Sequence, residues 1–199
     1  MDNKKIYDEM IRFLDTISYV KPDKIPYIDI YMDQVTGIMD EHLKRVKRHE
    51  DDKILTKTMI NNYTKAKILP PPEKKKYSRE HMFLLLFIYY YKGILSLEDL
   101  KTILEDVRTR YFKNDDISVE DIYKEVFSME ACQMEVLKKD ISQKFEQAQE
   151  TFKDIKKEAI NEDSLERLRL FSFACELGFD IYLKQLLLEN ICDRLHGEK

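Results

Sequence analysis

All five prolines of this 199-residue chain lie in its first 72 residues, and the stretch from residue 73 to residue 199 contains none. Glycine is scarce as well, with four in the whole chain. Strands need frequent turns, which these two residue types usually supply, so their scarcity favours long helices. Leucine, lysine, glutamate, methionine and isoleucine supply the helix-forming bulk of the chain. The sequence therefore predicts an all-α protein.

The helical spacing of apolar residues places the expected elements in the first half of the chain. It predicts helices over residues 3–19, 27–48, 56–65, 78–91 and 97–107. Residues 21–26 contain two prolines and are expected to form a linker, because proline breaks the helical hydrogen-bond ladder. The prolines at 70–72 must run extended. Ser96 followed by Asp99 is a capping-box signature for the helix 97–107.

The second half of the chain is expected to hold the longest helices. Ser118 and Asp121 form another capping-box signature, from which a long helix is predicted to run to about Lys157. The last stretch predicts helical segments over residues 163–177 and 181–195, and Gly178 between them is expected to stop or kink the helix. Apolar residues cover more than one face here, which is typical of a bundle centre or an oligomer interface. We expect a homodimer; the alternative is one larger bundle that includes the N-terminal helix.

The hydropathy pattern bears on the compartment. No run of 18 apolar residues occurs, and the densest stretch, Met82–Tyr91, has ten residues, about half of what a bilayer requires. The N-terminus is charged and lacks the apolar core of a signal peptide. These features predict a soluble cytoplasmic protein without membrane association.

Motifs for enzyme or metal chemistry are absent from the sequence. It contains no Gly-rich phosphate-binding loop, no nucleophile elbow and no zinc-binding HExxH. The four histidines show no paired spacing. Cys132, Cys175 and Cys192 show no CxxC spacing and are expected to be small buried residues in helices. We therefore expect no enzyme activity, no cofactor and no metal.

The charge is unevenly distributed. The chain carries a net charge of −4, but residues 42–79 contain twelve Lys or Arg and four Asp or Glu, a net of +8. The remainder must then carry −12. A single basic segment in an acidic protein suggests a local anionic partner. The alternative is a solvated face of a lysine-rich protein.

Residues 54–107 combine this basic segment with an informative order of elements. They read ILTKTMINNYTKAKILPPPEKKKYSREHMFLLLFIYYYKGILSLEDLKTILEDV: a short helix, a proline-containing extended hairpin, a long apolar helix, a Gly turn and a capped helix. This order resembles the winged helix-turn-helix of MerR-type regulators. The matching residues are Tyr63, Leu69, Pro70 and Pro71, then Tyr77-Ser78, and then Ser96-Leu97-Glu98-Asp99-Leu100. The chain has Lys67-Ile68 where that family usually has Gly before its leucine, and its wing is short.

A wider stretch, from Pro26 to about Val107, resembles a bacterial family catalogued as domain-of-unknown-function family 1836. The resemblance rests on the segments IPYIDIYMDQV and DDKILTKTMINNYTKAKILPPP. It implies a helix-turn-helix and no known reaction.

The resemblance to MerR-type regulators implies a recognition helix over residues 56–65. Such a helix needs exposed polar side chains that reach base edges and phosphates. The candidates are Lys57, Thr58, Asn61, Asn62, Thr64 and Lys65. The residues expected along the phosphate backbone are Lys65, Lys67, Lys74, Lys75, Lys76 and Arg79. Met59, Ile60 and Tyr63 are expected to face the core.

Together these patterns predict two parts. Residues 1–110 would form N-terminal helices and a MerR-like helix-turn-helix, and residues 118–199 a long-helix bundle for dimerisation or effector binding. The expected function is a DNA-binding transcriptional regulator, with double-stranded DNA and a second copy as partners. The alternative is a helical protein-interaction module whose helix-turn-helix scaffold does not bind DNA.

Overall fold

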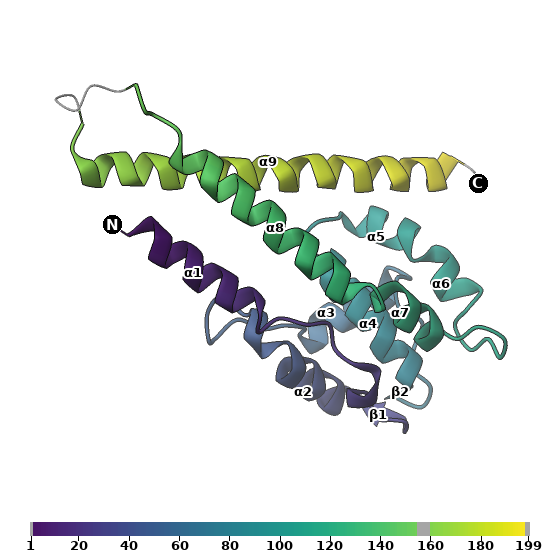
Figure 1. Cartoon of the computed structure of the whole chain (residues 1–199). Helices are drawn as coiled ribbons and strands as arrows, with labels where there is room; N and C mark the ends of the chain where they lie inside the picture. The colour runs from purple at the N-terminus through teal and green to yellow at the C-terminus, as the bar shows by residue number, and fades with distance from the viewer. Residues whose placement is uncertain (1, 155–159, 198–199) are drawn as a thin grey trace. The chain divides into compact units, whose positions relative to one another are not determined.

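The computed structural model describes residues 2–154 and 160–197. This part of the chain is mostly helical, as predicted, and also contains a small two-stranded antiparallel sheet (Figure 1). The predicted all-α class did not include this sheet. The chain divides into two compact units that alternate along the sequence. Unit 1 comprises Met1–Ser18 and Met129–Leu186; unit 2 comprises Tyr19–Ser128 and Leu187–Lys199. The N-terminal helix thus groups with the later helices.

Unit 2 holds most of the short elements. In chain order they are the 3-10 turn η1 (Pro22–Lys24), β1 (Ile30–Tyr31), α2 (Met32–Leu43), the 3-10 turn η2 (Lys44–Val46), α3 (Lys57–Lys65), β2 (Lys76–Tyr77), α4 (Arg79–Tyr91), α5 (Leu97–Ile103), α6 (Glu105–Thr109) and α7 (Val119–Phe127). β1 pairs with β2 in antiparallel register, Ile30 with Tyr77 and Tyr31 with Lys76. The sheet therefore joins the segment before α2 to the segment before α4.

The centre of unit 2 is α4. All residues from His81 to Ile88 are buried, so the densest apolar run of the sequence is a helix covered on every side. An aromatic cluster joins α4 to α7, with the Phe83 and Tyr123 ring centroids 4.9 Å apart. The Tyr123 hydroxyl donates a 2.8 Å hydrogen bond to the Val20 carbonyl and so satisfies its buried polar tip.

Unit 1 is built from α1 (Asn3–Leu14), α8 (Glu130–Gln149) and the first part of α9 (Glu162–Gly197). Its buried residues are Ile141, Phe145, Ala148 and Phe173, with Tyr7, Met10, Ile11, Leu14, Leu170 and Leu177 packed around them. The Asn3 side chain donates a 2.8 Å hydrogen bond to the Glu166 carbonyl and ties α1 to α9. Because so few residues are fully buried, this core is small.

Several helix boundaries match the sequence prediction and others do not. Helices 57–65 and 79–91 are confirmed, whereas α1 and α2 are shorter than expected. The predicted continuous helix from Ser118 is wrong: it breaks between α7 and α8, where the Ser128 hydroxyl donates to the Glu125 carbonyl at 2.7 Å. Its expected end at Lys157 lies outside the described residues.

The last helix also differs from its prediction. α9 runs without interruption from Glu162 to Gly197, so Gly178 neither stops nor breaks it. Within residues 2–154 and 160–197, no helix combines the length and apolarity needed to cross a membrane.

Candidate nucleic-acid interface

α3 presents a polar face opposite its buried face. The helix begins after Thr56, whose hydroxyl accepts a 3.1 Å hydrogen bond from the Met59 amide. Ile60 and Tyr63 are buried in the core of unit 2. At 100° per residue the opposite side carries five exposed polar residues: Lys57, Thr58, Asn61, Asn62 and Lys65. The structure therefore brings five of the six sequence candidates on this helix to one face.

Thr64 does not belong to this face. It is half-buried, and its hydroxyl donates to the Ile60 carbonyl at 3.2 Å. Such back-bonding to the preceding turn occupies the hydroxyl within the helix. We therefore omit Thr64 from the candidate interface.

The C-terminus of α3 holds a lysine in an unusual backbone conformation. Lys67 has φ of 59°, in the left-handed region. The Lys67 amide bonds the Thr64 carbonyl at 3.1 Å and the Ile68 amide bonds the Tyr63 carbonyl at 2.9 Å, which is a Schellman end. Glycine usually takes this position because its lack of Cβ removes the steric cost. Here the position carries an exposed cation instead.

Two more lysines in left-handed conformation form the tip of a tight hairpin. Glu73 and Lys76 exchange backbone hydrogen bonds of 2.8 and 3.1 Å, and the residues between them, Lys74 and Lys75, have φ of 48° and 66°. Positive φ at both central residues is the signature of a type I′ turn, which favours Asn-Gly. Both lysines are exposed. The buried Tyr77 in β2 anchors the base of this hairpin in the core.

Lys76 lies closer to the protein than the two tip lysines. It is half-buried, and its Nζ lies 5.4 Å from the centroid of the Tyr31 ring. This cation–π contact crosses from β2 to β1. Lys76 is therefore partly committed to the sheet.

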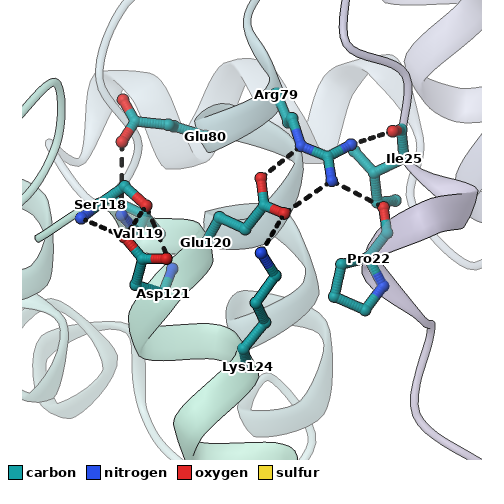
Figure 2. Close-up of polar contacts among 9 residues, drawn as sticks. All are labelled: Pro22, Ile25, Arg79, Glu80, Ser118, Val119, Glu120, Asp121 and Lys124. Atoms are coloured by element: carbon teal, nitrogen blue, oxygen red, sulfur yellow. Dashed lines mark hydrogen bonds and ion pairs between the residues drawn. The ribbon is translucent and has the colours of Figure 1, made fainter.

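Arg79 is placed differently from its predicted role along a phosphate backbone. Its guanidinium donates to the Glu120 carboxylate at 2.5 and 2.9 Å and to the Pro22 carbonyl at 2.9 Å, and it also bonds the Ile25 carbonyl (Figure 2). The centroid of the Tyr27 ring lies 3.9 Å from the Cζ atom of Arg79. The Arg79 side chain is only 11% exposed. Because its donors are used inside unit 2, we remove Arg79 from the candidate interface.

The Arg79–Glu120 pair holds three segments of unit 2 together: η1, the start of α4 and the first turn of α7. The hydrogen bond from Arg79 lowers the pKa of Glu120 to about 2, and Lys124, at 2.8 Å, adds to the effect. The pKa of Arg79 is raised by the same hydrogen bond. This charge-assisted, bidentate pair fixes the entry into α4, and with it the base of the hairpin.

The part of the basic segment that carries the lysine candidates contains few acidic residues. Between residues 54 and 76 there are six lysines and one acidic residue, Glu73. Lys57 pairs with Asp33 and Glu73 pairs with Lys113, and all four side chains are at least half exposed. Exposed pairs of this kind are weak and screened by salt, so phosphates can compete for Lys57.

His81 is a residue whose role the sequence patterns did not predict. It occupies the third position of α4, where the Ser78 amide donates to its Nδ1 at 3.0 Å. The ring is 2% exposed and packs edge-on against Tyr77 and Phe112. Burial lowers the pKa of His81. The usual capping box has Glu or Gln at the third helical position, so its pattern does not include His81, although the Ser-x-x-His spacing is present in the sequence.

In the described parts of the chain, no group of three or more His, Cys, Asp or Glu side chains could hold a metal ion. Contrary to the expectation that all three cysteines are buried, Cys132 and Cys175 are exposed, and only Cys192 is buried.

Comparisons with known proteins give one family. Neither the curated proteins nor the solved structures provide a match to the chain. One family model matches residues 20–126, which are 107 of the 199 residues and nearly coincide with the first segment of unit 2. On this match, the chain belongs to the family described as Domain of unknown function (DUF1836).

Proposed function

We propose that the chain is a DNA-binding transcriptional regulator that contacts duplex DNA through α3 and the Lys74–Lys75 hairpin tip. The observation that carries the proposal is the placement of Lys67, Lys74 and Lys75 at positive φ, where glycine or asparagine is less costly. Backbone strain of this kind clusters at functional sites. These three positions all carry exposed cations: Lys67 ends α3, and Lys74 and Lys75 form the tip of the hairpin that follows it. Two other non-glycine residues of the described chain have positive φ, Lys113 and Phe152, and they lie outside the basic segment.

The exposed face of α3 suits a recognition helix. An α-helix fits the major groove of B-DNA, and an asparagine side chain can form two hydrogen bonds with adenine. Asn61 and Asn62 lie on the exposed face, between Lys57 and Lys65 at its two ends. We assign base reading to the asparagines and phosphate contacts to the lysines.

The order of elements supports a MerR-like arrangement. A short capped helix, a tight hairpin and a long buried helix follow one another within residues 56–91, as the resemblance to MerR-type regulators implies. In this interpretation the hairpin 73–76 is the wing and α3 is the recognition helix. The wing would be unusually short, since its tip has only two residues.

The test is binding of fluorescent duplex DNA over a range of salt concentrations, first with random genomic fragments and then with selected sites. If Lys57, Lys65, Lys67, Lys74 and Lys75 each neutralise one phosphate, log affinity falls against log salt with a slope of about −4.5. Reversing Lys74 and Lys75 to Glu should weaken binding to all sequences about equally.

The matched control reverses Lys5 and Lys139, which are exposed lysines of unit 1, so the net charge changes by the same amount. This control should retain DNA binding. A folded chain that binds no duplex at low salt would refute the proposal, and the protein-interaction module would then be the better hypothesis.

A further inference from the structure

The middle of α9 exposes a broad apolar surface. On one side, Phe173 is buried and Leu170 and Leu177 pack against the core of unit 1. Six large apolar side chains of α9 within unit 1 are left exposed by this core: Phe171, Phe179, Ile181, Tyr182, Leu183 and Leu186. At 100° per residue, four of them lie opposite the core-facing stripe, and Ile181 and Leu183 border that stripe on its two sides. A helix of this kind has a second face that requires a partner.

The size of this surface fits a stable protein interface. Phe171, Phe179, Ile181 and Tyr182 are 56–65% exposed, and the two leucines are each 42% exposed. Together they expose on the order of 600 Å² of apolar area. A standard interface buries about 800 Å² per partner, of which somewhat more than half is apolar. The exposed face of α9 alone therefore supplies the apolar part of such an interface.

Gly178 lies within this apolar surface. It is exposed, and a Cβ added to it would meet nothing within 4 Å. Glycine in a helix interior is unfavourable relative to alanine, and no contact of the described chain requires it. Glycine does permit the close approach of a second backbone, so we take Gly178 as the crossing point of a second helix.

The sequence around this point is self-complementary in antiparallel orientation. When two antiparallel copies of α9 cross at residue 179, Phe179 of one copy faces Phe179 of the other, and Cys175 faces Leu183. In the same register Arg167 lies level with position 191 of the other copy, between Glu189 and Asp193. A parallel pair would instead place Arg167 opposite Arg167, with like charges facing each other.

From these features we infer that α9 pairs antiparallel with α9 of a second copy of this chain and that the helices cross near Gly178–Phe179. Such a pairing is isologous, because one surface contacts the same surface on its partner, and it closes a two-fold dimer. It covers the face that unit 1 leaves open. The inference does not depend on DNA binding, so a dimer that binds no DNA would refute only the proposed function.

The mass in solution tests the pairing. Light scattering of the full chain should give twice the 24.0 kDa chain mass at micromolar concentration. Phe179→Glu should yield a monomer with unchanged helix content. The matched control is Val136→Glu, which places the same charge on an exposed residue of α8 in unit 1 and should remain dimeric. A chain that is monomeric throughout, or a dimer that survives Phe179→Glu, would overturn the inference.

A second variant separates pairing from folding. Gly178→Gln introduces a side chain into open space and a better helix former, so the single chain should fold at least as well. At the proposed crossing point the added side chain should weaken dimerisation at least tenfold. An unchanged dimer affinity with this variant would refute Gly178 as the crossing point.

Cross-linking tests the orientation. With the exposed Cys132 replaced by Ser, Leu183→Cys should form covalent dimers with a short bifunctional thiol reagent, by joining Cys175 to position 183 of the other copy. The parent with Cys175 alone should cross-link much less. Equal cross-linking of the parent would indicate parallel helices and would contradict the antiparallel arrangement.

Discussion

Replacing Lys74 and Lys75 by glycine should raise the free energy of unfolding and weaken DNA binding at the same time. Lys74 and Lys75 both have positive φ, and a Cβ in that region costs about 1–2 kcal/mol per residue. Glycine removes this cost but loses more backbone entropy on folding, by about 0.5–1 kcal/mol. The expected gain for Lys74→Gly with Lys75→Gly is therefore about 1 kcal/mol in the free energy of unfolding.

The expected loss in DNA affinity follows from counterion release. Each phosphate contact adds about −0.9 to the slope of log affinity against log salt, which amounts to about fivefold in affinity at 0.15 M salt. Removing two contacts should lower affinity about 25- to 30-fold and make the slope about 1.8 units shallower. The assays are urea unfolding followed by circular dichroism and fluorescence anisotropy with a labelled duplex.

Alanine at the same two positions is the matched control. It removes the charges but keeps a Cβ at positive φ, so DNA affinity should fall as with glycine while stability stays near that of the parent. Equal stability of the glycine and alanine variants would refute the argument from strain. Unchanged affinity in both would remove the hairpin tip from the interface.

Three further predictions concern single positions. If Asn61 or Asn62 reads a base, changing it to Ala should cost about 1–3 kcal/mol of binding free energy on a selected DNA site and little on random DNA. Equal losses on both DNAs in the binding titrations would mean that the asparagine contacts only the DNA backbone. Arg79→Ala should lower the free energy of unfolding by about 3 kcal/mol, since it leaves Glu120 without its main partner. A still-folded variant should keep its DNA salt slope. A shallower slope without faster amide exchange at the Glu73–Lys76 turn would restore Arg79 to the interface. Burial lowers the pKa of His81 in the folded state below its unfolded value of about 6.5. The unfolded state therefore binds the proton more tightly, and the free energy of unfolding should fall as the pH drops below about 6.5. His81→Gln can still cap α4 and should flatten that dependence in urea titrations at pH 7 and pH 5.

The elements that sequence patterns predicted well are those specified locally. α3 has a capping threonine at its start and apolar residues on one face, and α4 coincides with the longest apolar run. The proline run marked a segment without helix before the hairpin. Each of these signals lies within a few residues of the structure that it specifies, so one segment suffices to predict it.

The features that were missed depend on distant residues or on weak local signals. Arg79 follows a lysine run and was grouped with it, but its partner Glu120 lies 41 residues later, and no local pattern announces that pairing. β1 and β2 have two residues each and are specified by their pairing with one another. The break between α7 and α8 has only Ser128 as a local signal, whereas Gly178 is a strong signal that the surrounding helix overrides.

The strain at the candidate interface and the rigidity beneath it are linked. A residue in left-handed conformation persists only where its surroundings determine the backbone more strongly than its own preference does. Buried residues lie on both sides of the strained lysines: Leu69 before the hairpin and Tyr77 after it. The bidentate pair of Arg79 then fixes the start of α4. Weakening that pair should therefore loosen the hairpin before it unfolds unit 2, and amide exchange at the Glu73–Lys76 turn should rise in Arg79→Ala more than exchange within α4.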